Sequence, residues 1–440
     1  MSRSTFLGGI HTYEGKDLTM DKPTVKLLPK GDLVFPLTQH IGAPAKPIVA
    51  KGDKVLVGQK IAEASGKISA NIISSVSGTV KVIEKRLTVH GEMVESIVIE
   101  NDNEYKAIEG FGQDRDYTKL SKSQIRDIIK EAGIVGLGGA GFPTHVKLTP
   151  KDDSKIDYVI VNGAECEPYL TSDYRMMLEE PEKIVGGLKV MLRLFDRAKG
   201  IIAIEDNKPK AIKIMKQLTE NEPNIEVRPL KTKYPQGAER QLVYVTTGRK
   251  LNSHKLPADV GCIVDNVDTV IAIYMAVAKS TPLIRKIVTV SGNAVKNPQN
   301  FNVCIGIDYW EILQAAGEFI ERPEKIISGG PMMGVAMYSC NVPVMKTSSA
   351  LLGFLKDEAA YEESPCIRCG KCHEVCPMRL MPTKLAEVAK RSDKESFVKL
   401  DGMECCGCGC CTYICPAKRN LNQPILETRR EILKERKIHH

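Results

Sequence analysis

The chain has 440 residues, a length that corresponds to roughly three domains at about 150 residues each. Hydrophobic residues make up 42% and charged residues 26% of it, which is the balance of a folded soluble protein and excludes both a single small module and a disordered chain. The net charge of +8 comes without a basic stripe interleaved with aromatic residues, so we expect no nucleic acid as a partner.

No segment of the sequence has the length of a membrane span. The longest apolar run, residues 270–278, is half of the ~18 residues that a span needs. The N-terminus has no apolar core of the kind found in signal peptides. We therefore expect a cytosolic protein whose contact with a membrane comes only through partners.

The first domain is predicted over residues 1–110. Within it, residues 44–83 combine short β-rich runs with glycine turns, and this pattern resembles the barrel-sandwich fold of lipoyl and biotinyl domains. Carrier domains of that kind present a lysine near the last turn, but residues 71–77 contain none. We therefore interpret this domain as a structural and docking element.

Strands and helices alternate in the second domain, predicted over residues 115–282. This alternation predicts a Rossmann-like, mostly parallel α/β sheet, which binds ligands at the carboxyl ends of its strands. The predicted strands are 157–162, 200–205, 225–230 and 261–265, and the predicted helices are 174–195, 208–218, 238–246 and 267–278.

A glycine-rich loop opens this domain. Residues 136–141 satisfy G-x-G-x-x-G, but a helix precedes them, with Ser121 as N-cap and Gly133 as its end, where the dinucleotide fingerprint requires a strand. Such a loop lets the backbone approach a flat or phosphorylated ligand, and a merely tight connection is the alternative.

Polar residues follow the first predicted strand of the sheet. Asn162, Glu165 and Glu167 lie at or just past its end. At the carboxyl edge of a parallel sheet an amide and two carboxylates are placed for a ligand, although acidic residues there are often only solvated.

The third domain, predicted over 283–348, resembles the soluble-ligand-binding β-grasp module. A strand is expected at 286–291 and a short helix at 312–316. The methionine-containing loop 329–334 is expected to pack against the preceding α/β domain.

The cysteines carry the strongest motif in the chain. Ten of the fourteen lie between residues 366 and 415, and they include two runs of the form C-x2-C-x2-C-x3-C-P. This spacing is that of bacterial two-cluster ferredoxins, in which the fourth cysteine of each run ligates the other cluster. We expect one 4Fe-4S cluster on Cys366, Cys369, Cys372 and Cys415, and a second on Cys405, Cys408, Cys411 and Cys376.

A pair of structural zinc sites is the alternative to two clusters. Zinc needs only two cysteine pairs per ion, which leaves two complete runs ending in Cys-Pro unexplained. Cys406 and Cys410 fall outside the register and are expected to be unligated.

The ferredoxin-like α-helical domain is predicted over 360–420, with a helix at 383–397. A basic tail is predicted over 421–440, and it is interpreted as either a docking patch or a solvated face.

Four segments together resemble the NADH- and FMN-binding flavoprotein subunit of respiratory complex I. They are GLGGAGFPTHVK, NGAECEP, the segment Tyr234 to Glu239, and the segment Asp265 to Thr269. Combined with the two cysteine runs, they resemble the C subunits of the Rnf family of membrane-bound ferredoxin:NAD oxidoreductases. The segments at 6–11 and 39–44 also resemble that family, so the likeness covers nearly the whole chain.

The resemblance implies a site for non-covalent FMN and for NADH. The chain departs from the complex I flavoprotein at three positions: Ala164 stands in place of an aspartate, Ala238 in place of a glutamate, and Pro150 in place of a second stacking aromatic. These differences should affect the pose of the dinucleotide more than the binding of FMN. By the same resemblance, Glu167 and Glu239 would face the NADH, and FMN would carry the hydride transfer without a catalytic side chain. The full set of cofactor-binding residues that the resemblance implies is Gly136, Gly138, Gly139, Gly141, Phe142, Lys147, Asn162, Glu165, Glu167, Tyr234, Gly237, Glu239 and Asn266.

The resemblance further implies a relay of electrons between NAD(H), FMN and the two clusters. The partners would be the membrane and iron-sulfur subunits of the complex, with ferredoxin as an indirect partner and ion translocation performed by other subunits. The location would be peripheral, on the cytoplasmic face of the bacterial plasma membrane. Two alternatives remain: a soluble NADH-dependent cobalamin reductase of the same architecture, and a non-enzymatic scaffold with structural metal sites.

Overall fold

A four-stranded parallel sheet forms the centre of the α/β domain in the computed structural model, which describes residues 4–438. The strand order is β11-β10-β9-β12, and every neighbouring pair is parallel. All four predicted strands are confirmed, with ends shifted by at most one residue. The strands are β9 (Tyr158–Gly163), β10 (Lys199–Glu205), β11 (Ile225–Leu230) and β12 (Cys262–Asn266).

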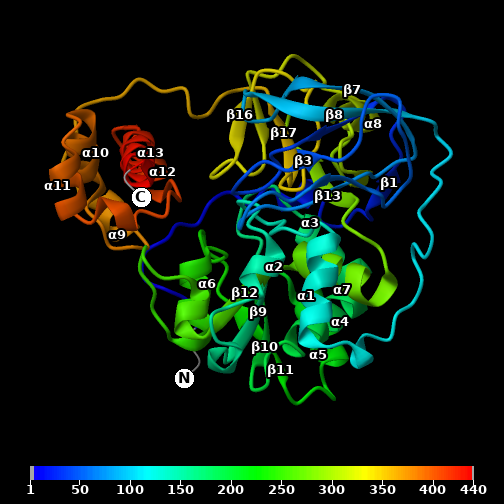
Figure 1. Cartoon of the computed structure of the whole chain (residues 1–440). Coiled ribbons are helices and arrows are strands. Elements are labelled where there is room, and N and C mark those ends of the chain that lie inside the picture. The colour runs from blue at the N-terminus through cyan, green and yellow to red at the C-terminus, as the bar shows by residue number, and fades with distance from the viewer. Residues whose placement is uncertain (1–3, 439–440) are drawn as a thin grey trace.

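Helices cover both faces of this sheet (Figure 1). Alternate residues of β9 point to opposite faces, so that Val159 and Val161 belong to one core with α1, α4 and α7, whereas Ile160 packs with Leu242 of α6. Helix α1 begins with the predicted Ser121 capping box. The helices are α1 (Lys122–Glu131), α2 (Thr144–Lys147), α3 (Ser172–Glu179), α4 (Pro181–Leu192), α5 (Pro209–Leu218), α6 (Glu239–Thr247) and α7 (Val267–Lys279).

The predicted single helix 174–195 is wrong, because the structure has α3 and α4 in its place. Glu180 separates them with φ −132° and ψ 41°, and Pro181 begins α4. Proline disfavours helical geometry in the residue before it and is well accommodated at the first position of a helix. One proline therefore ends one helix and starts the next.

Two small antiparallel sheets form the N-terminal barrel-sandwich. Their strand orders are β2-β8-β7-β4 and β3-β5-β6. The lysine-free segment 71–77 is buried, and Ser75 Oγ donates a hydrogen bond to the carbonyl of Ile305 in the β-grasp domain. The strands are β2 (Leu33–Pro36), β3 (Lys46–Pro47), β4 (Lys54–Val55), β5 (Lys60–Glu63), β6 (Ile72–Ile73), β7 (Gly78–Leu87) and β8 (Met93–Asn101).

The β-grasp sheet recruits strands from beyond the predicted range 283–348. Its order is β1-β14-β13-β17-β15-β16, in which β1 comes from the N-terminal region and β17 follows residue 348. Helix α8 (Tyr309–Ala315) packs on this sheet. It begins three residues before the predicted start at residue 312. The strands are β1 (Val25–Leu27), β13 (Arg285–Ser291), β14 (Gln299–Cys304), β15 (Lys325–Ser328), β16 (Val335–Met337) and β17 (Ala350–Phe354).

The C-terminal helical domain lies to one side of the rest of the chain (Figure 1). The predicted helix 383–397 is wrong, because it is broken at Ser392, which has a φ of 57°, and Asp393 caps a new helix. The helices are α9 (Lys371–Glu374), α10 (Pro382–Lys390), α11 (Lys394–Lys399), α12 (Cys410–Tyr413) and α13 (Asn422–Ile438).

The segment predicted as a basic tail, 421–440, is part of this domain rather than an appendage. It forms α13, whose Ile425 and Ile432 are buried in one core with Leu385 of α10; residues 439–440 lie outside the described part of the chain. Periodic isoleucines between the basic residues explain the difference, since they give the helix an apolar face.

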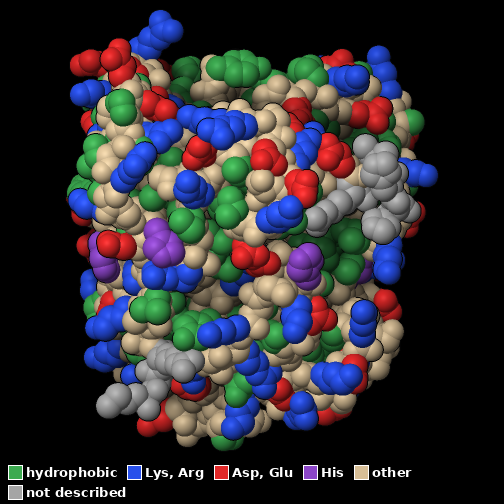
Figure 2. Space-filling view, turned by 90° about the vertical axis from the view of Figure 1, so that its left-hand side faces the viewer, with side chains coloured by type: hydrophobic (Ala, Val, Ile, Leu, Met, Phe, Trp, Pro, Cys, Tyr) green, Lys and Arg blue, Asp and Glu red, His purple; other side chains and the backbone are tan. Residues whose placement is uncertain are grey.

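The side of the molecule that carries this domain has a mixed surface. Figure 2 shows Lys and Arg side chains spread among Asp and Glu side chains there. Within residues 4–438, no helix is both long and apolar enough to cross a bilayer.

Candidate functional site

Four strand ends meet at one edge of the parallel sheet and place polar residues there. Asn162 is the last but one residue of β9, Asp265 and Asn266 end β12, and Glu205 ends β10. The segment that follows β11 brings Tyr234, Gly237 and Glu239 to the same edge. We call this group the strand-end edge.

Asn162 is held in one orientation. Its Nδ2 donates to the carbonyl of Gly237 at 2.9 Å, and its Oδ1 accepts from the backbone N–H of Ala164 at 3.2 Å. A Cβ atom on Gly237 would lie 3.3 Å from Cys166 Sγ and 3.5 Å from Asn162 Oδ1. Two segments that the resemblance assigns to the flavin are therefore joined directly.

The glycine loop presents bare backbone at this edge. Gly138, Gly139 and Ala140 are exposed, whereas the buried N–H of Leu137 donates to Thr269 Oγ1 of α7 at 2.9 Å. A Cβ atom on Gly138 would come within 2.7 Å of Asn266. The loop is thus anchored at its start, and glycine is required where it passes Asn266.

Lys147 and Asp265 form a buried ion pair at the end of β12. Lys147 Nζ lies 3.0 Å from Asp265 Oδ1 and donates to the carbonyl of Val264 at 2.7 Å. Burial lowers the pKa of Lys147, but the nearby carboxylates of Asp265 and Glu239 outweigh it and raise the pKa overall. Burial raises the pKa values of Asp265 and Glu239.

Glu165 adopts an unfavourable backbone conformation, with φ 49°. Its Oε1 accepts from the backbone N–H of Asp173 at 2.7 Å, and its burial raises the pKa of the carboxyl. Asp173 in turn accepts from Asn266 Nδ2 at 2.6 Å, and burial, followed by the charge of Glu165, raises its pKa to about 7. A non-glycine residue held at positive φ indicates that the surrounding structure fixes this carboxylate.

Glu167 faces the loop of the β-grasp domain. Its Oε2 accepts from the N–H of Met332 at 3.1 Å, and Gly330 leaves no room for a Cβ atom beside it. Burial raises the pKa of Glu167 to about 7. The expected packing of loop 329–334 on the α/β domain is confirmed by this contact.

Other predicted residues lie at the periphery of the edge. Phe142 is half-buried, and its carbonyl accepts from the N–H of Gly136 at 2.9 Å, which closes the base of the glycine loop. Gly139 has open space beside it, and Gly141 has a φ of 71°. Tyr234 points away from the edge, since its hydroxyl donates to the carbonyl of Cys408 at 2.9 Å.

Sequence reasoning missed the buried lysines behind this edge. Lys16 Nζ donates to the carbonyls of Glu167 at 2.9 Å and Leu170 at 2.5 Å, and Lys208 Nζ donates to that of Ala164 at 2.7 Å. Burial lowers the pKa of Lys16. No motif marks these residues, because Lys16 lies about 150 residues from the loop that it holds.

The strand-end edge fits a bound flavin nucleotide. It offers exposed glycine backbone, fixed amides and a lysine, and three carboxylate oxygens are buried without a hydrogen-bond partner among the described residues. These orphaned atoms are Glu165 Oε2, Glu167 Oε1 and Asp265 Oδ2. Buried polar atoms of this kind are usually satisfied by a ligand or by water.

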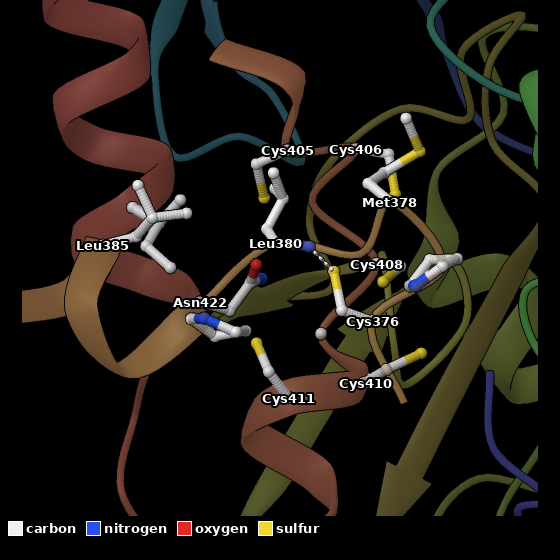
Figure 3. Close-up of a pocket in the computed structure, with 14 residues that line it drawn as sticks. Cys376, Met378, Leu380, Leu385, Cys405, Cys406, Cys408, Cys410, Cys411 and Asn422 are labelled. Carbon is white, nitrogen blue, oxygen red and sulfur yellow. Dashed lines mark hydrogen bonds between the residues drawn. The ribbon is translucent and has the colours of Figure 1, made fainter. Parts of the chain in front are cut away.

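The predicted ligands of the second cluster line one pocket. Cys376, Cys405, Cys408 and Cys411 all contribute to it, although Cys376 lies in the other run. In Figure 3 the sulfurs of Cys376, Cys405 and Cys411 point toward a common space. Cys410, which the register leaves unligated, lines the pocket too, but its sulfur points away from that space.

The first run forms a more exposed loop. Cys369 is exposed and Cys372 is buried. Burial raises the pKa of the Cys372 thiol. Helices α9 and α12, which carry Cys372 and Cys411, are in contact, and Ser364 Oγ bonds to the carbonyl of Ala417, so the two runs lie beside each other as crossed ligation requires.

Backbone N–H groups point at the cysteine sulfurs. The N–H of Arg368 donates to Cys366 Sγ and that of Leu380 to Cys376 Sγ, both at 3.4 Å. In the described part of the chain, no three His, Cys, Asp or Glu side chains converge closely enough for a single ion.

The chain matches four family models in succession. They are the RnfC barrel sandwich hybrid domain over residues 4–104, the Nuo51 FMN-binding domain over 129–275, the SLBB domain over 287–336 and the 4Fe-4S dicluster domain over 365–418. The chain therefore carries an FMN-binding domain and a domain for two 4Fe-4S clusters.

Two curated relatives match this chain over most of their length. The chain is 46% identical over 403 residues to the C subunit of the proton-translocating ferredoxin:NAD(+) oxidoreductase complex of Clostridium ljungdahlii, covering 90% of this chain and 88% of that protein. It is 42% identical to the C subunit of the Na(+)-translocating ferredoxin:NAD(+) oxidoreductase complex of Acetobacterium woodii, covering 99% of each chain.

A solved structure shares the fold. An NAD+-reducing NiFe-hydrogenase in its H2-reduced state has a TM-score of 0.50 and 16% sequence identity, over 73% of this chain and 62% of that chain. The likeness concerns the arrangement of the elements alone.

Proposed function

We propose that this chain exchanges electrons with NAD(H) in an ion-translocating ferredoxin:NAD(+) oxidoreductase complex, because it belongs to the family of the C subunits of these complexes. The electrons pass through FMN and two 4Fe-4S clusters. Ion translocation is the work of partner subunits. The two relatives from Clostridium ljungdahlii and Acetobacterium woodii, matched over 88% and 99% of their length, favour this function over a soluble cobalamin reductase.

One observation carries the proposal: the α/β domain that carries the strand-end edge is in direct contact with the second cysteine run. Arg240 of α6 binds Glu404, just before Cys405, with Nη1 2.9 Å from Oε2. The N–H and hydroxyl of Ser253 also donate to this carboxylate. A flavin and a cluster can exchange electrons only if they are held close together, and this contact brings their predicted sites together.

The residues of the chain position the cofactors. When bound, FMN accepts the two electrons of a hydride and releases them singly, and each cluster carries one electron at a time. The glycine loop and the amides of Asn162 and Asn266 would hold the flavin at the strand-end edge. Gly237 and Glu239 would close the site from the segment after β11.

The cysteine assignment belongs to the same proposal. Cys366, Cys369, Cys372 and Cys415 would hold one cluster, and Cys405, Cys408, Cys411 and Cys376 the other. The shared pocket of the second set supports this crossed arrangement.

The proposed partners are the membrane and iron-sulfur subunits of the complex, with ferredoxin as an indirect partner. We place the chain at the cytoplasmic face of the membrane, held there by other subunits. The support is the membership of the relatives in ion-translocating complexes, together with the finding that no described helix could cross a bilayer.

Affinity purification from native membranes tests this function. A tagged chain solubilised in mild detergent should bring down membrane-spanning subunits in fixed ratio and should reduce NAD with reduced ferredoxin. The function is contradicted if the chain purifies alone from the soluble fraction with full FMN and clusters, and if it reduces cobalamin with NADH.

A further inference from the structure

A small polar cavity opens where β10 and β11 end. Its volume is about 50 Å³, which is room for roughly three water molecules. His11 and Glu14 are exposed at its rim, whereas Lys16 and Glu205 are buried at its floor. The glycine loop lies by β12, the outer strand on the other side of the sheet. The other lining residues are Ile10, Thr12, Cys166, Pro168, Asn207, Thr232, Lys233 and Tyr234.

Four ionisable side chains gather at and below this floor. Lys208 Nζ lies 3.4 Å from Glu205 Oε2, and the exposed fractions of these two side chains are 2% and 1%. Lys16 and Lys208 both lie close enough to Glu165 and to Glu205 for their charges to act on these carboxyls. Two lysines and two carboxyls therefore form one group, which lines the cavity through Lys16 and Glu205.

The two carboxyls are suited to proton exchange. Burial raises the pKa of Glu165 and of Glu205, although the charges of the two lysines oppose the rise. A higher pKa brings the gain and loss of a proton by a carboxyl closer to neutral pH. The thiol of Cys166 also lines the cavity, but burial raises its pKa to about 12, so this thiol stays protonated.

Glu165 connects this group to the flavin side. Its Oε1 accepts from the N–H of Asp173 at 2.7 Å, and its Oε2 is buried without a hydrogen-bond partner among the described residues. Asp173 is bonded to Asn266, which the resemblance assigns to FMN. Because the two lysines hold backbone carbonyls on either side of Glu165, its segment is fixed between the strand-end edge and the cavity.

Hydride chemistry leaves one proton to be moved at such a site. A hydride carries one proton and two electrons, and the clusters take up electrons alone. After both electrons have left, one proton must pass to solvent, and reduction of NAD takes up one proton in the opposite direction. The bound dinucleotide would cover the exposed glycine loop, so this proton needs another way out.

We infer that the cavity is this way out: Glu165 accepts the proton at the strand-end edge, and Glu205 passes it to water in the cavity. Each carboxylate gains and loses one proton, so neither changes overall, and Lys16 and Lys208 hold the pair in place. The passage rests on the proposed function, because only hydride exchange at a flavin produces this proton. The alternative is a set of ion pairs that only fixes the loop after β9.

Stopped-flow measurement on the full chain loaded with FMN and clusters follows the proton directly. The chain is reduced with one equivalent of NADH and saturated with tetrahydro-NAD, a dinucleotide analogue that donates no hydride. It is then mixed with ferricyanide in weak buffer that contains a pH indicator. In the wild type, proton release should keep pace with flavin reoxidation.

In Glu205→Gln, proton release should lag several-fold behind flavin reoxidation. Its matched control is Glu220→Gln, an exposed carboxyl just after α5, which should behave as the wild type does. If Glu205→Gln loses FMN while its proton release stays in step, Glu205 belongs to the ion pairs alone and the passage is overturned.

A second variant narrows the cavity without changing an ionisable group. Thr12→Phe places a bulky side chain in the lining. Its control is Tyr13→Trp, at a neighbouring side chain that is 68% exposed and outside the lining. Proton release should lag in Thr12→Phe and not in Tyr13→Trp. Equal release in these two variants would show that the cavity carries no protons.

Infrared difference spectra, recorded while an electrode reduces the flavin, give a readout that needs no turnover. The wild type should show the C=O band of a protonated carboxyl that changes between the two redox states and shifts in D2O. The band should be lost in Glu205→Gln and kept in Glu220→Gln. An unchanged band in Glu205→Gln overturns the passage but leaves the proposed function intact, whereas failure of NADH to reduce the wild-type flavin contradicts the function itself.

Discussion

At the scale of single residues, the account depends on side chains that are fixed before any ligand binds. Asn162 is the clearest example, because both ends of its amide are engaged by backbone groups. The carboxylates around it are buried and partly without partners. Such a site needs little rearrangement to bind a flavin.

Asn162→Ala should weaken FMN binding. The change leaves the Gly237 carbonyl and the Ala164 N–H without their partner, a loss of about 1–3 kcal/mol, so the FMN dissociation constant should rise by roughly tenfold or more. Fluorescence titration of the apoprotein with FMN measures this. Asn224→Ala, at the opposite edge of the same sheet, is the control and should bind FMN as the wild type does. Equal affinity in both variants would refute the placement of the flavin.

Cys376→Ser should damage the cluster of the other run. Its sulfur lies in the pocket with Cys405, Cys408 and Cys411, so we expect altered or lost resonance signals from that cluster and an intact signal from the cluster of Cys366, Cys369 and Cys372. Electron paramagnetic resonance spectra of the reduced variant show which of the two clusters is lost. The reverse pattern would mean that each run holds its own cluster.

The sequence could predict those site residues that a spacing or a motif marks, such as the cysteines and Asn162. It could not predict Lys16 or Lys208, because nothing local distinguishes a buried lysine from a solvated one. The bond between Asp173 and Asn266 was not predictable either, because it joins residues that lie 93 positions apart. Contacts of this kind are fixed by the fold rather than by local sequence.

At the scale of elements, periodicity located the strands of the parallel sheet and missed the breaks in two helices. The break at Pro181 had a visible signal in the proline itself. The break at Ser392 depends on a positive φ and on the new cap at Asp393, which hydrophobic periodicity does not show. The basic composition of α13 hid its apolar face.

Ile425→Ala should destabilise the C-terminal domain. Ile425 is 1% exposed in one core with Leu385, so its truncation should cost about 2–5 kcal/mol and should make the clusters more labile. Leu433→Ala, in the same helix but 36% exposed, should have a much smaller effect. Thermal loss of the cluster absorbance compares the two variants. Identical curves would show that α13 does not support the clusters.

At the scale of the whole molecule, the relative placement of the domains was not predictable from sequence. Resemblances indicated each domain, but none of them showed that Ile10 of the N-terminal segment packs with Cys410 of the second cysteine run. Lys346 is a second example, since its Nζ donates to the carbonyls of Asn71 at 2.5 Å and Gly133 at 2.7 Å. It joins the barrel-sandwich, the α/β domain and the β-grasp region at one buried point.

Lys346 should make stability depend on pH. Burial lowers its pKa from 10.5 to about 7, so between these values the unfolded chain holds a proton that the folded chain has released. Stability therefore rises with pH across this window, by up to about 1.4 kcal/mol per pH unit from this group. Urea unfolding from pH 7.5 to 9.5 should show a smaller rise in Lys346→Met than in the wild type. Parallel curves would contradict the buried neutral lysine.

An anaerobic titration of the purified chain with NADH shows whether electrons pass from NADH through the flavin to the two clusters. Absorbance should show flavin bleaching, and resonance spectra should then show both clusters reduced, in a protein with FMN and about eight iron atoms per chain. The account is contradicted if NADH leaves the flavin oxidised, or if it reduces the flavin while both clusters stay oxidised until dithionite is added.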